Sequence, residues 1–327
     1  MTTRRKFLSL AGAALATPAL PRLARAQTPA PVWPTKNIRA MIPFSAGSTL
    51  DIVGRIVLDP LATQLGQTIV VENRGGAGGT IGTAMTAKAD PDGYTILVQA
   101  SAHSAAPAAY PNLAYDPARD FSAVVAFGTV PNVTVVSPQK GIKTIQELVA
   151  AAKAGSFTYA SAGVGSATHW AAERLRLAAG FNAIHVPFRG APEALTEVLA
   201  GRVDVYFAPA PPAIEFIRDG KLLALAVSSV RRAAALPDVP TTLEAGFPDS
   251  DFDFWVGMFA PKLTPRGIVA RIHAETVKAL QNPAVIAKLA NLGVEPLIQS
   301  PEDFDARVAK EARIAVELAR AAKIPLQ

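Results

Sequence analysis

The sequence predicts an α/β protein in which two α/β domains are joined by two strands, with a ligand cleft between them. Short apolar runs rich in β-formers alternate with helical patterns along most of the chain, which is typical of largely parallel sheets. Two further β-rich runs, 130–136 and 252–259, bracket a self-contained α/β segment. A first domain that is interrupted by a second in this way has the layout of a hinged binding protein.

Length and composition agree with a folded two-domain protein. The chain has 327 residues, of which 50% are hydrophobic and 18% are charged, and a single compact domain seldom grows this large. The absence of cysteine excludes disulfides, thiolate nucleophiles, Cys-ligated zinc and iron–sulfur clusters.

The N-terminal segment has the pattern of an export signal. Arg4, Arg5 and Lys6 precede an apolar stretch that is too short to span a bilayer, and residues 24–26 read Ala-Arg-Ala, a small-x-small cleavage pattern. We expect residues 1–26 to be a cleaved signal peptide. The paired arginines favour a twin-arginine signal, and an ordinary Sec signal is the alternative. Either route predicts a soluble periplasmic protein.

The excess positive charge belongs to this signal. A pI near 9.6 suggests a nucleic-acid partner, but residues 1–27 contain five basic residues and no acidic one. Taking those five from the 32 basic residues leaves 27 against 26 acidic residues. We therefore expect no nucleic-acid partner.

The first domain is expected to span 28–131 together with 251–327. Its first helix is marked by apolar residues that recur every three or four positions, and Pro60 is expected to kink or shorten it. Three C-terminal helices have no sheet of their own and should pack on this domain. The expected elements are strands at 38–44, 68–72 and 94–98, helices at 51–65 and from the Gly-rich turn to 89, a small polar loop at 101–104, and helices near 265–281, 284–292 and 301–322.

The second domain is expected to span 132–250. Gly201 and Gly220 each follow a helical pattern, where a helix needs a left-handed residue to end, and a strand comes after each of them. The expected elements are helices at 145–154, to 179 and to 199, and strands at 158–161, 183–187, 203–205 and 222–227.

Catalytic and cofactor motifs are not evident in the sequence. The glycines at 76, 78 and 82 are similar to a dinucleotide fingerprint, but the next strand does not end in the acidic residue that would hold a ribose. No Gly-x-Ser-x-Gly occurs, and Ser-x-x-Lys at 137–140 does not open a helix. The four histidines lack metal-binding spacing. We therefore expect no catalytic residue, no metal site and no cofactor.

Two strand-to-helix loops of small residues are the candidate binding elements. The first loop, 45–49, reads Ser-Ala-Gly-Ser-Thr, and the second loop, 162–168, reads Ala-Gly-Val-Gly-Ser-Ala-Thr. A helix start offers unpaired N–H groups and a partial positive charge, and small residues let an anion approach them. Loops that face each other across the cleft would clamp an acidic ligand, whereas two ordinary N-caps are the alternative.

A series of short motifs follows the signal segment. Residues 43–51, Pro-Phe-Ser-Ala-Gly-Ser-Thr-Leu-Asp, are similar to the pattern Pro-Phe-x-Ala-Gly-Gly-x-x-Asp, and 71–79 read Val-Glu-Asn-Arg-Gly-Gly-Ala-Gly-Gly. His-Val-Pro-Phe-Arg-Gly at 185–190 and Leu-Pro-Asp-Val-Pro-Thr at 236–241 come later in the same order. Together they resemble the extracytoplasmic solute receptors of tripartite tricarboxylate transporters, the Bordetella uptake gene (Bug) family. The resemblance implies a type II periplasmic-binding-protein fold that closes around a carboxylic acid and hands it to a two-component membrane permease.

The resemblance also implies which residues bind the ligand. Asp204 is expected to orient the second loop, because a bare carboxylate facing an anionic ligand would repel it. The implied ligand-binding residues are Phe44, Ala46, Gly47, Ser48, Thr49 and Asp51 at the first loop, Ser101 and His103 in the small polar loop, Gly163, Val164, Gly165, Ser166, Thr168 and His169 at the second loop, and Phe188 and Asp204 elsewhere in the second domain.

Three departures from the family pattern narrow the expected ligand. Ser48 replaces the second glycine, Leu50 stands where a hydroxyl or amide is usual, and 208–213 contains no acid to pair with a ligand ammonium. We expect a carboxylic acid without an amine, whose apolar or aromatic body touches Leu50, Phe44 or Phe188. The expected function is a monomeric receptor rather than an enzyme. A periplasmic sensor for a two-component system and a periplasmic esterase or lyase on the same scaffold are the alternatives.

Overall fold

The computed structural model describes residues 33–252 and 254–322, and all of these except Trp33 belong to one compact unit that begins at Pro34. The expected signal peptide, 1–26, lies outside the described residues. The first sheet of the compact unit has the strand order β11 (Glu295–Pro296), β4 (Phe121–Val130), β10 (Phe254–Pro261), β3 (Thr95–Ala100), β1 (Ile38–Ile42) and β2 (Ile69–Asn73). The second has the order β7 (Ile184–Pro187), β6 (Thr158–Ser161), β8 (Val205–Pro209), β5 (Asn132–Val136) and β9 (Leu223–Val227).

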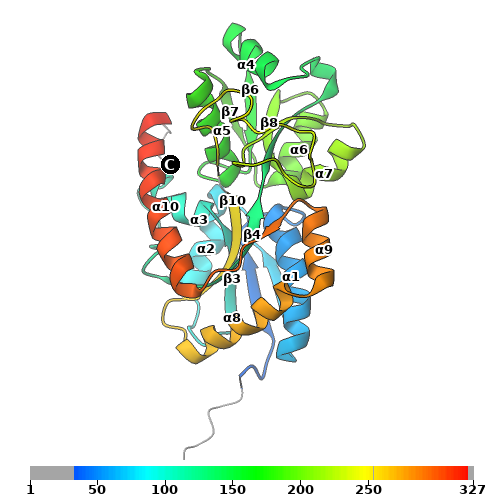
Figure 1. Ribbon diagram of the computed structural model, residues 1–327. Coiled ribbons are helices and arrows are strands. Elements are labelled where there is room, and N and C mark those ends of the chain that lie inside the picture. Colours follow the sequence, from blue (N-terminus) through cyan, green and yellow to red (C-terminus); the bar gives the residue numbers. More distant parts are fainter. Residues whose placement is uncertain (1–32, 253, 323–327) are drawn as a thin grey trace, which may run out of the picture. The chain divides into compact units, whose positions relative to one another are not determined.

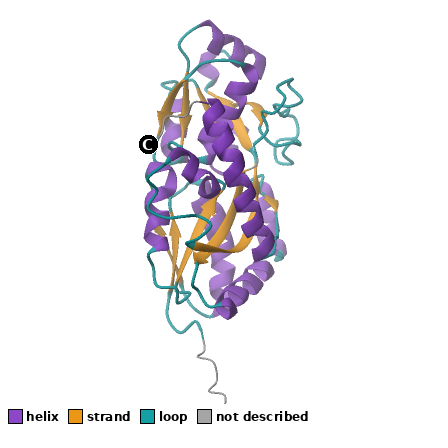
Figure 2. Ribbon diagram, turned by 90° about the vertical axis from the view of Figure 1, so that its left-hand side faces the viewer, coloured by secondary structure: helices purple, strands orange, loops and turns teal. Residues whose placement is uncertain are grey.

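Helices surround both sheets (Figures 1 and 2). We call the first sheet and its helices the first lobe, and the second sheet and its helices the second lobe. The helices of the first lobe are α1 (Thr49–Leu65), the short η1 (Ala77–Gly79), α2 (Thr80–Ala87), α3 (Ala102–Ala109), α8 (Arg266–Leu280), α9 (Pro283–Asn291) and α10 (Pro301–Ala322). Those of the second lobe are the short η2 (Pro138–Lys140), α4 (Ile145–Ala154), α5 (Ala167–Ala179), α6 (Ala191–Leu199) and α7 (Ala210–Arg218).

Both sheets are mixed, and the antiparallel pairing involves the strands next to the crossings between lobes. Strand β1 pairs in parallel with β2 and β3, whereas β10 is antiparallel to β3 and β4. In the second lobe β6 is parallel to β7 and β8, and β5 is antiparallel to β8 and β9. The chain leaves the first sheet at Pro131 and returns to it with β10. This arrangement confirms the predicted α/β fold, while the exact domain limits remain a prediction.

Helix α1 ends at Leu65 as expected, so Pro60 does not shorten it, and a kink at Pro60 stays a prediction. One local prediction in the first lobe was wrong. The expected polar loop at 101–104 is the start of helix α3, for which Ser101 is the N-cap. Five of the eight residues of α3 are alanine, the strongest helix former, and this propensity outweighs the polar residues at its start.

Helix α10 joins the two lobes. Its Phe304 is fully buried and lies edge-on against Trp255, with ring centroids 4.8 Å apart. Nearer its C-terminal end, Ala315 and Ala319 share an apolar cluster with Trp170 of α5 in the second lobe. The C-terminal helices were expected to pack on the first domain, and they do. Helix α8 packs on α1 and β4 of that lobe, but α10 also contacts α5 (Figure 1).

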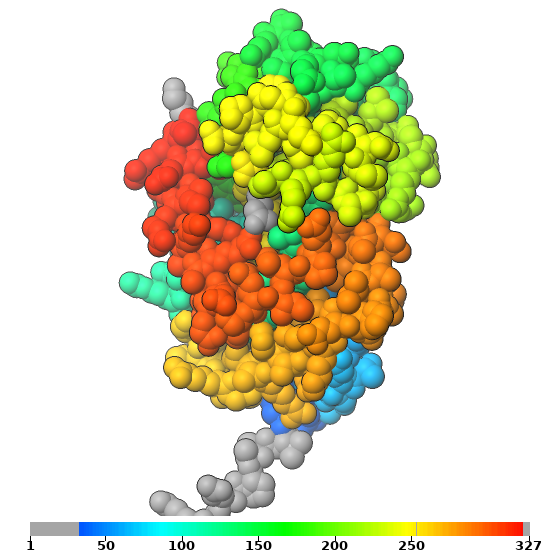
Figure 3. Space-filling view, viewed as in Figure 1, coloured from blue at the N-terminus to red at the C-terminus, as the bar shows by residue number. Residues whose placement is uncertain are grey.

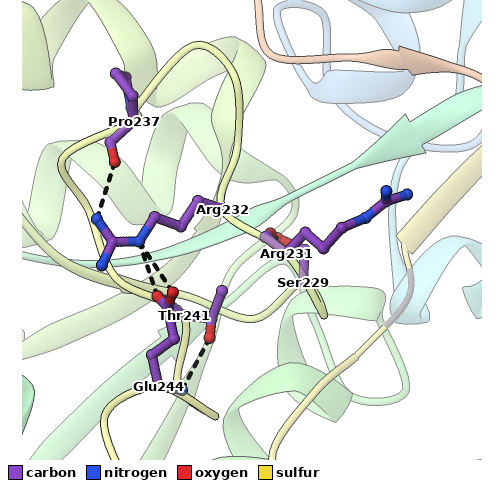
Figure 4. A network of polar contacts seen from close by, with 6 residues as sticks. All are labelled: Ser229, Arg231, Arg232, Pro237, Thr241 and Glu244. Carbon is purple, nitrogen blue, oxygen red and sulfur yellow. Dashed lines mark hydrogen bonds and ion pairs between the residues drawn. The ribbon is translucent and has the colours of Figure 1, made fainter.

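The segment between β9 and β10 is tied together by side chains. Arg232 Nε donates to the Glu244 carboxylate at 2.9 Å, and an Arg232 Nη1 hydrogen bond of 3.1 Å reaches the Pro237 carbonyl. Thr241 and Glu244 accept hydrogen bonds from each other's backbone N–H. Figure 4 shows Arg231 directed away from this network. These contacts hold a stretch without long helices or strands that carries the chain back toward the first lobe.

We predict that Phe304→Ala lowers the free energy of unfolding by about 3–5 kcal/mol, because it removes a fully buried ring and leaves a cavity under α10. Val316→Ala, at a side chain of the same helix that is 37% exposed, should change it by less than about 0.5 kcal/mol. Urea denaturation of both variants measures the difference. Equal losses would contradict the packing described for α10.

Candidate functional site

Five helices begin around one small cavity between the lobes, one of them α7, whose N-cap Pro209 lies in the wall. Its wall includes the N-cap and first residues of α1 and α5, together with Ala102 of α3 and Ala191 of α6. The first turn of a helix carries unpaired N–H groups, and the helix dipole places about half a positive charge there. None of the described residues that line the cavity is charged. The wall is therefore electropositive through the backbone rather than through arginine or lysine.

Three buried hydroxyl groups at this cavity lack a protein partner. Ser48 Oγ, Thr49 Oγ1 and the Tyr206 hydroxyl make no hydrogen bond of regular geometry with any described residue. Burial raises the pKa of Tyr206, and the nearby Thr168 hydroxyl opposes that shift. The phenol is thus protonated and can donate. Because buried polar groups are nearly always paired, these three hydroxyls indicate that an acceptor-rich ligand completes the site.

The first loop is positioned by Asp51. Its Oδ2 accepts from the Gly47 N–H at 2.9 Å, and its Oδ1 accepts from Arg55 Nε at 2.9 Å and from Asn73 Nδ2 at 3.2 Å. The same Asn73 amide donates to the Phe44 carbonyl at 3.0 Å. Since this carboxylate and the Gly47 N–H are already paired, Asp51 and Gly47 fix the loop's shape and leave ligand contact to the start of α1.

The second loop is held by its own helix. Gly165 N–H donates to His169 Nδ1 at 3.1 Å, and Trp170 Nε1 donates to the Gly165 carbonyl at 2.8 Å. Gly163 N–H donates to Ser161 Oγ at 3.0 Å. The N–H groups of both glycines are therefore occupied. The donors left for an anion in this region are those of the first turn of α5.

His169 is neutral in this arrangement. Its ring stacks on His185 with centroids 4.1 Å apart, and His185 stacks in turn on Tyr159 at 4.8 Å. Burial, followed by the charge of Arg176, lowers the pKa of His169 to about 4. Burial and the neighbouring His169 lower the pKa of His185 to about 3. A neutral His169 can accept from the Gly165 N–H, which explains how the stack supports the second loop.

The two lobes touch beside the cavity. Tyr110, whose pKa burial raises to about 12, donates from its hydroxyl to the Val164 carbonyl at 2.9 Å. Ser45 Oγ donates to Glu193 Oε1 at 2.8 Å. A Cβ added to Gly78 would lie 2.1 Å from the Val164 oxygen. The cavity enclosed behind these contacts measures about 20 Å³, which is room for about one water, so a larger ligand enters only when the lobes separate.

The polar-loop candidates lie outside this cavity. Ser101 lines a larger cavity beside α10. His103 is fully buried between Phe259, at 4.5 Å between centroids, and Phe121, at 5.0 Å. Burial lowers the pKa of His103 to about 3, opposed by the nearby Pro117 carbonyl, although neither ring nitrogen makes a regular hydrogen bond within the described chain. His103 is therefore a neutral core residue.

Two candidates in the second lobe also lie away from the cavity wall. Phe188 is half-buried and packs against the apolar core of its lobe. Asp204 accepts from Lys140 Nζ at 2.6 Å and from the Thr158 N–H at 2.8 Å. Burial raises the pKa of Asp204, but Lys140 and Thr158 outweigh it, so the pKa is lowered overall. The contacts of Asp204 thus anchor the start of β6 and do not reach the second loop.

The structure brings part of the predicted set together and adds residues that sequence reasoning missed. Of the expected ligand-binding residues, those in the cavity wall are Phe44, Ser48, Thr49, Ser166 and Thr168. Tyr206 and Phe254 also line it, and no motif in the sequence marks either one. The start of α6 could have been found, because Gly190 and Pro192 follow a strand as helix-opening residues.

The described residues offer little support for other kinds of site. Within 33–252 and 254–322, no group of three or more His, Asp or Glu side chains is arranged to hold a metal ion. Over the same residues, no helix is both long and apolar enough to cross a membrane.

Two mixed α/β lobes with two crossings and a cavity between them define a solute-binding protein of the type II periplasmic-binding-protein fold. Sequence comparison identifies the family. The family described as "Tripartite tricarboxylate transporter family receptor" matches residues 53–320, and the chain belongs to it.

Individual relatives cover most of the chain. Protein BugT of Bordetella pertussis is 33% identical over 313 residues, which are 94% of this chain and 94% of BugT. The structure of R. palustris Rpa4515 with adipate is similar at a TM-score of 0.87 and 29% identity, over 90% of this chain and 100% of that one. The structure of MatC from Rhodopseudomonas palustris with bound malate is similar at a TM-score of 0.83 and 31% identity. The match covers 88% of this chain and 99% of MatC.

We predict that His103→Phe flattens the dependence of stability on pH. The folded-state pKa of about 3 lies below the ordinary 6.5, so the unfolded chain takes up a proton first as the pH falls. The stability contributed by neutral His103 is complete above pH 6.5 and is lost between pH 6.5 and 3, by up to about 1.4 kcal/mol per pH unit. Urea denaturation across this range should show a smaller loss for the variant, and identical slopes would contradict the burial of this ring.

We predict that Gly78→Ala shifts the protein toward a more open form, because the new Cβ would collide with the Val164 carbonyl of the other lobe. Gly66→Ala is the matched control, since Gly66 has a similar φ of +68° against +61° and has no atom within 4 Å of an added Cβ. Both substitutions carry about 1–2 kcal/mol of backbone strain. Small-angle X-ray scattering should give a larger radius of gyration for Gly78→Ala alone, and equal radii would contradict the closed contact.

Proposed function

We propose that the protein is a periplasmic receptor that binds a small carboxylic acid between its lobes and delivers it to a two-component membrane permease. The observation that carries this proposal is the meeting of five helix starts and three unpartnered hydroxyls around a cavity whose described lining has no charged side chain. Such a wall suits an anion rich in acceptor atoms. The adipate and malate bound by Rpa4515 and MatC are dicarboxylates, and they support the same class of ligand.

The roles of the site residues follow from their contacts. The hydroxyls of Ser48 and Thr49 at the start of α1 hold the carboxylate together with the first-turn N–H groups. Ser166 and Thr168 at the start of α5 share a hydrogen bond of 3.0 Å, so one of their two hydroxyls can donate to the ligand beside the N–H groups of that turn. Tyr206 donates a further hydrogen bond. The remaining loop candidates shape this surface without touching the ligand: Ala46, Gly47 and Asp51 in the first lobe, and Gly163, Val164, Gly165 and His169 in the second.

The cavity favours an acid without an amine. Phe44, Leu50 and Phe254 provide an apolar part of the wall, and no acidic side chain lines it within the described residues. Glu193 is an acid nearby that raises the pKa of Tyr206, but it lies outside the wall and accepts from Ser45 across the lobes. A ligand ammonium would therefore lose its water without gaining a carboxylate partner.

Binding is coupled to closure. A ligand larger than one water needs the lobes to be less tightly closed than they are here, where the cavity measures about 20 Å³. Between the starts of α1 and α5 it touches both lobes only when they come together around it, so it stabilises that ligand-bound closed form. The permease then distinguishes a loaded receptor by its shape. We further propose that residues 1–26 direct export by the twin-arginine route, that the exported protein is a soluble monomer, and that it binds its ligand without cofactor or catalysis.

We predict that a thermal-shift screen of mono-, di- and tricarboxylates, aromatic ones included, identifies a stabilising ligand. An acid at 100 times its dissociation constant should add about 2.7 kcal/mol to the free energy of unfolding. Ser166→Asp should weaken that ligand more than tenfold, because aspartate still caps α5 but places a negative charge in the cavity wall.

Thr144→Asp is the matched control, since Thr144 caps α4, away from the cavity wall, through the same kind of side-chain hydrogen bond. It should leave the affinity unchanged. Stabilisation by a sugar or a cation but by no carboxylate would contradict the proposed function. An α-amino acid that binds more tightly than its deaminated analogue would contradict the absence of an ammonium site.

A further inference from the structure

A second and much larger cavity lies along α10. It measures about 640 Å³, within the range of small-molecule sites, and it shares no lining residue with the cavity between the helix starts. Its walls come from α3 and α10 of the first lobe, α5 of the second lobe, and residues 251–252 between them. Figure 3 shows a hollow between the red α10 and the yellow segment near residue 250.

One face of α10 forms most of the cavity wall and changes character along its length. The lining positions of this helix are 303, 306, 307, 310, 311, 314, 315 and 318, whose spacing of three and four residues places them on a single face. The first part of this face is polar, with Asp303, Arg307, Lys310 and Glu311. The second part is apolar, with Ile314 and Leu318, and it faces a cavity that Trp170 and Phe252 also line. The cavity therefore has a polar end and an apolar end.

Among the described residues at the polar end, Lys310 has no acidic partner and Asp303 has no basic one, since its carboxylate accepts from Ser300 Oγ at 2.8 Å. Arg307 Nε donates to Glu311 Oε1 at 2.9 Å, and the other Glu311 oxygen accepts from Trp255 Nε1 at 2.7 Å. Across the cavity, Arg174 pairs with Asp251. No ion pair or hydrogen bond within the described residues involves the Lys310 ammonium, so it can receive a carboxylate.

Two buried polar atoms of residues in the wall also lack partners. Ser101 is 3% exposed, and its Oγ makes no hydrogen bond with any residue that the structure describes. Gln299 Oε1 is likewise buried and unpaired there. Both residues line the cavity. Since orphaned buried groups are rare, these two indicate that polar atoms of a ligand or of bound water reach this part of the wall.

We propose that this cavity is a second ligand site, for an amphipathic monocarboxylic acid with a medium-length apolar chain. The carboxylate lies at Lys310, and the chain follows Ile314 and Leu318 toward Trp170, a distance of about 12 Å along the helix from Lys310 to Leu318 at 1.5 Å per residue. Because both lobes form the wall, an occupant binds the closed and open forms unequally and so biases closure.

Octanoate binding to the full chain, followed by isothermal titration calorimetry, tests this site. Ile314→Glu places a negative charge at the apolar end, and Lys310→Glu reverses the charge at the polar end. Each should weaken octanoate at least tenfold. The matched controls lie on α9 outside the cavity wall: Ile286→Glu, whose side chain is 40% exposed against 43% for Ile314, and Lys288→Glu. Both should leave octanoate affinity unchanged.

The Ser166→Asp variant separates the two sites, because it should retain octanoate binding while losing the short acid of the cleft. Absence of saturable octanoate binding, or equal weakening in the controls, would overturn the proposal. So would octanol binding as tightly as octanoate, since the carboxylate would then contribute nothing. Loss of octanoate binding in Ser166→Asp, with no loss in Ile314→Glu, would place octanoate in the cleft and reject the second site.

Discussion

The starts of five helices meet at a cavity whose described lining residues carry no charge, and the first-turn acids Asp51 and Glu193 lie outside its wall. Unpaired first-turn N–H groups are ordinary at a protein surface, where water satisfies them, but here they are enclosed with three unpartnered hydroxyls. Burying such groups costs free energy unless something accepts from them. This constraint explains why an occupant rich in acceptor atoms would stabilise the closed form, and why an anion suits the site better than a cation.

The rest of the structure keeps those donors available. Asp51 and His169 each accept from a loop glycine, which fixes the two loops without help from a ligand. Their contacts explain why a carboxylate can stand beside an anion site, since Asp51 is already paired with Arg55 and Asn73. Helix α10 adds a further connection between the lobes, beyond the two crossings and the hydrogen bonds of Tyr110 and Ser45. Both lobes line the larger cavity along this helix, so movement of one lobe alters that cavity.

The sequence predicted most of the helices and strands, because hydrophobic periodicity and glycine positions are local signals. It missed β4 at Phe121–Val130, and it failed at 101–104, where an alanine-rich stretch begins a helix. The two loops were recognisable from their small residues. Tyr206 was not recognisable, because the sequence alone does not distinguish a tyrosine that lines a cavity from any other core residue of a strand. Only the neighbouring strands and helices define that cavity. For the same reason the burial of His103 could not be foreseen.

The central claim is that backbone N–H groups at the starts of α1 and α5 hold the ligand. The most direct test is an amide ¹H–¹⁵N NMR titration of the protein with the carboxylic acid that stabilises it. The account predicts that the largest shift changes fall on the first-turn amides of Thr49, Leu50, Ala167 and Thr168, in both lobes at the same ligand concentration. Changes confined to one lobe, or to α10 with none at these four amides, would contradict it.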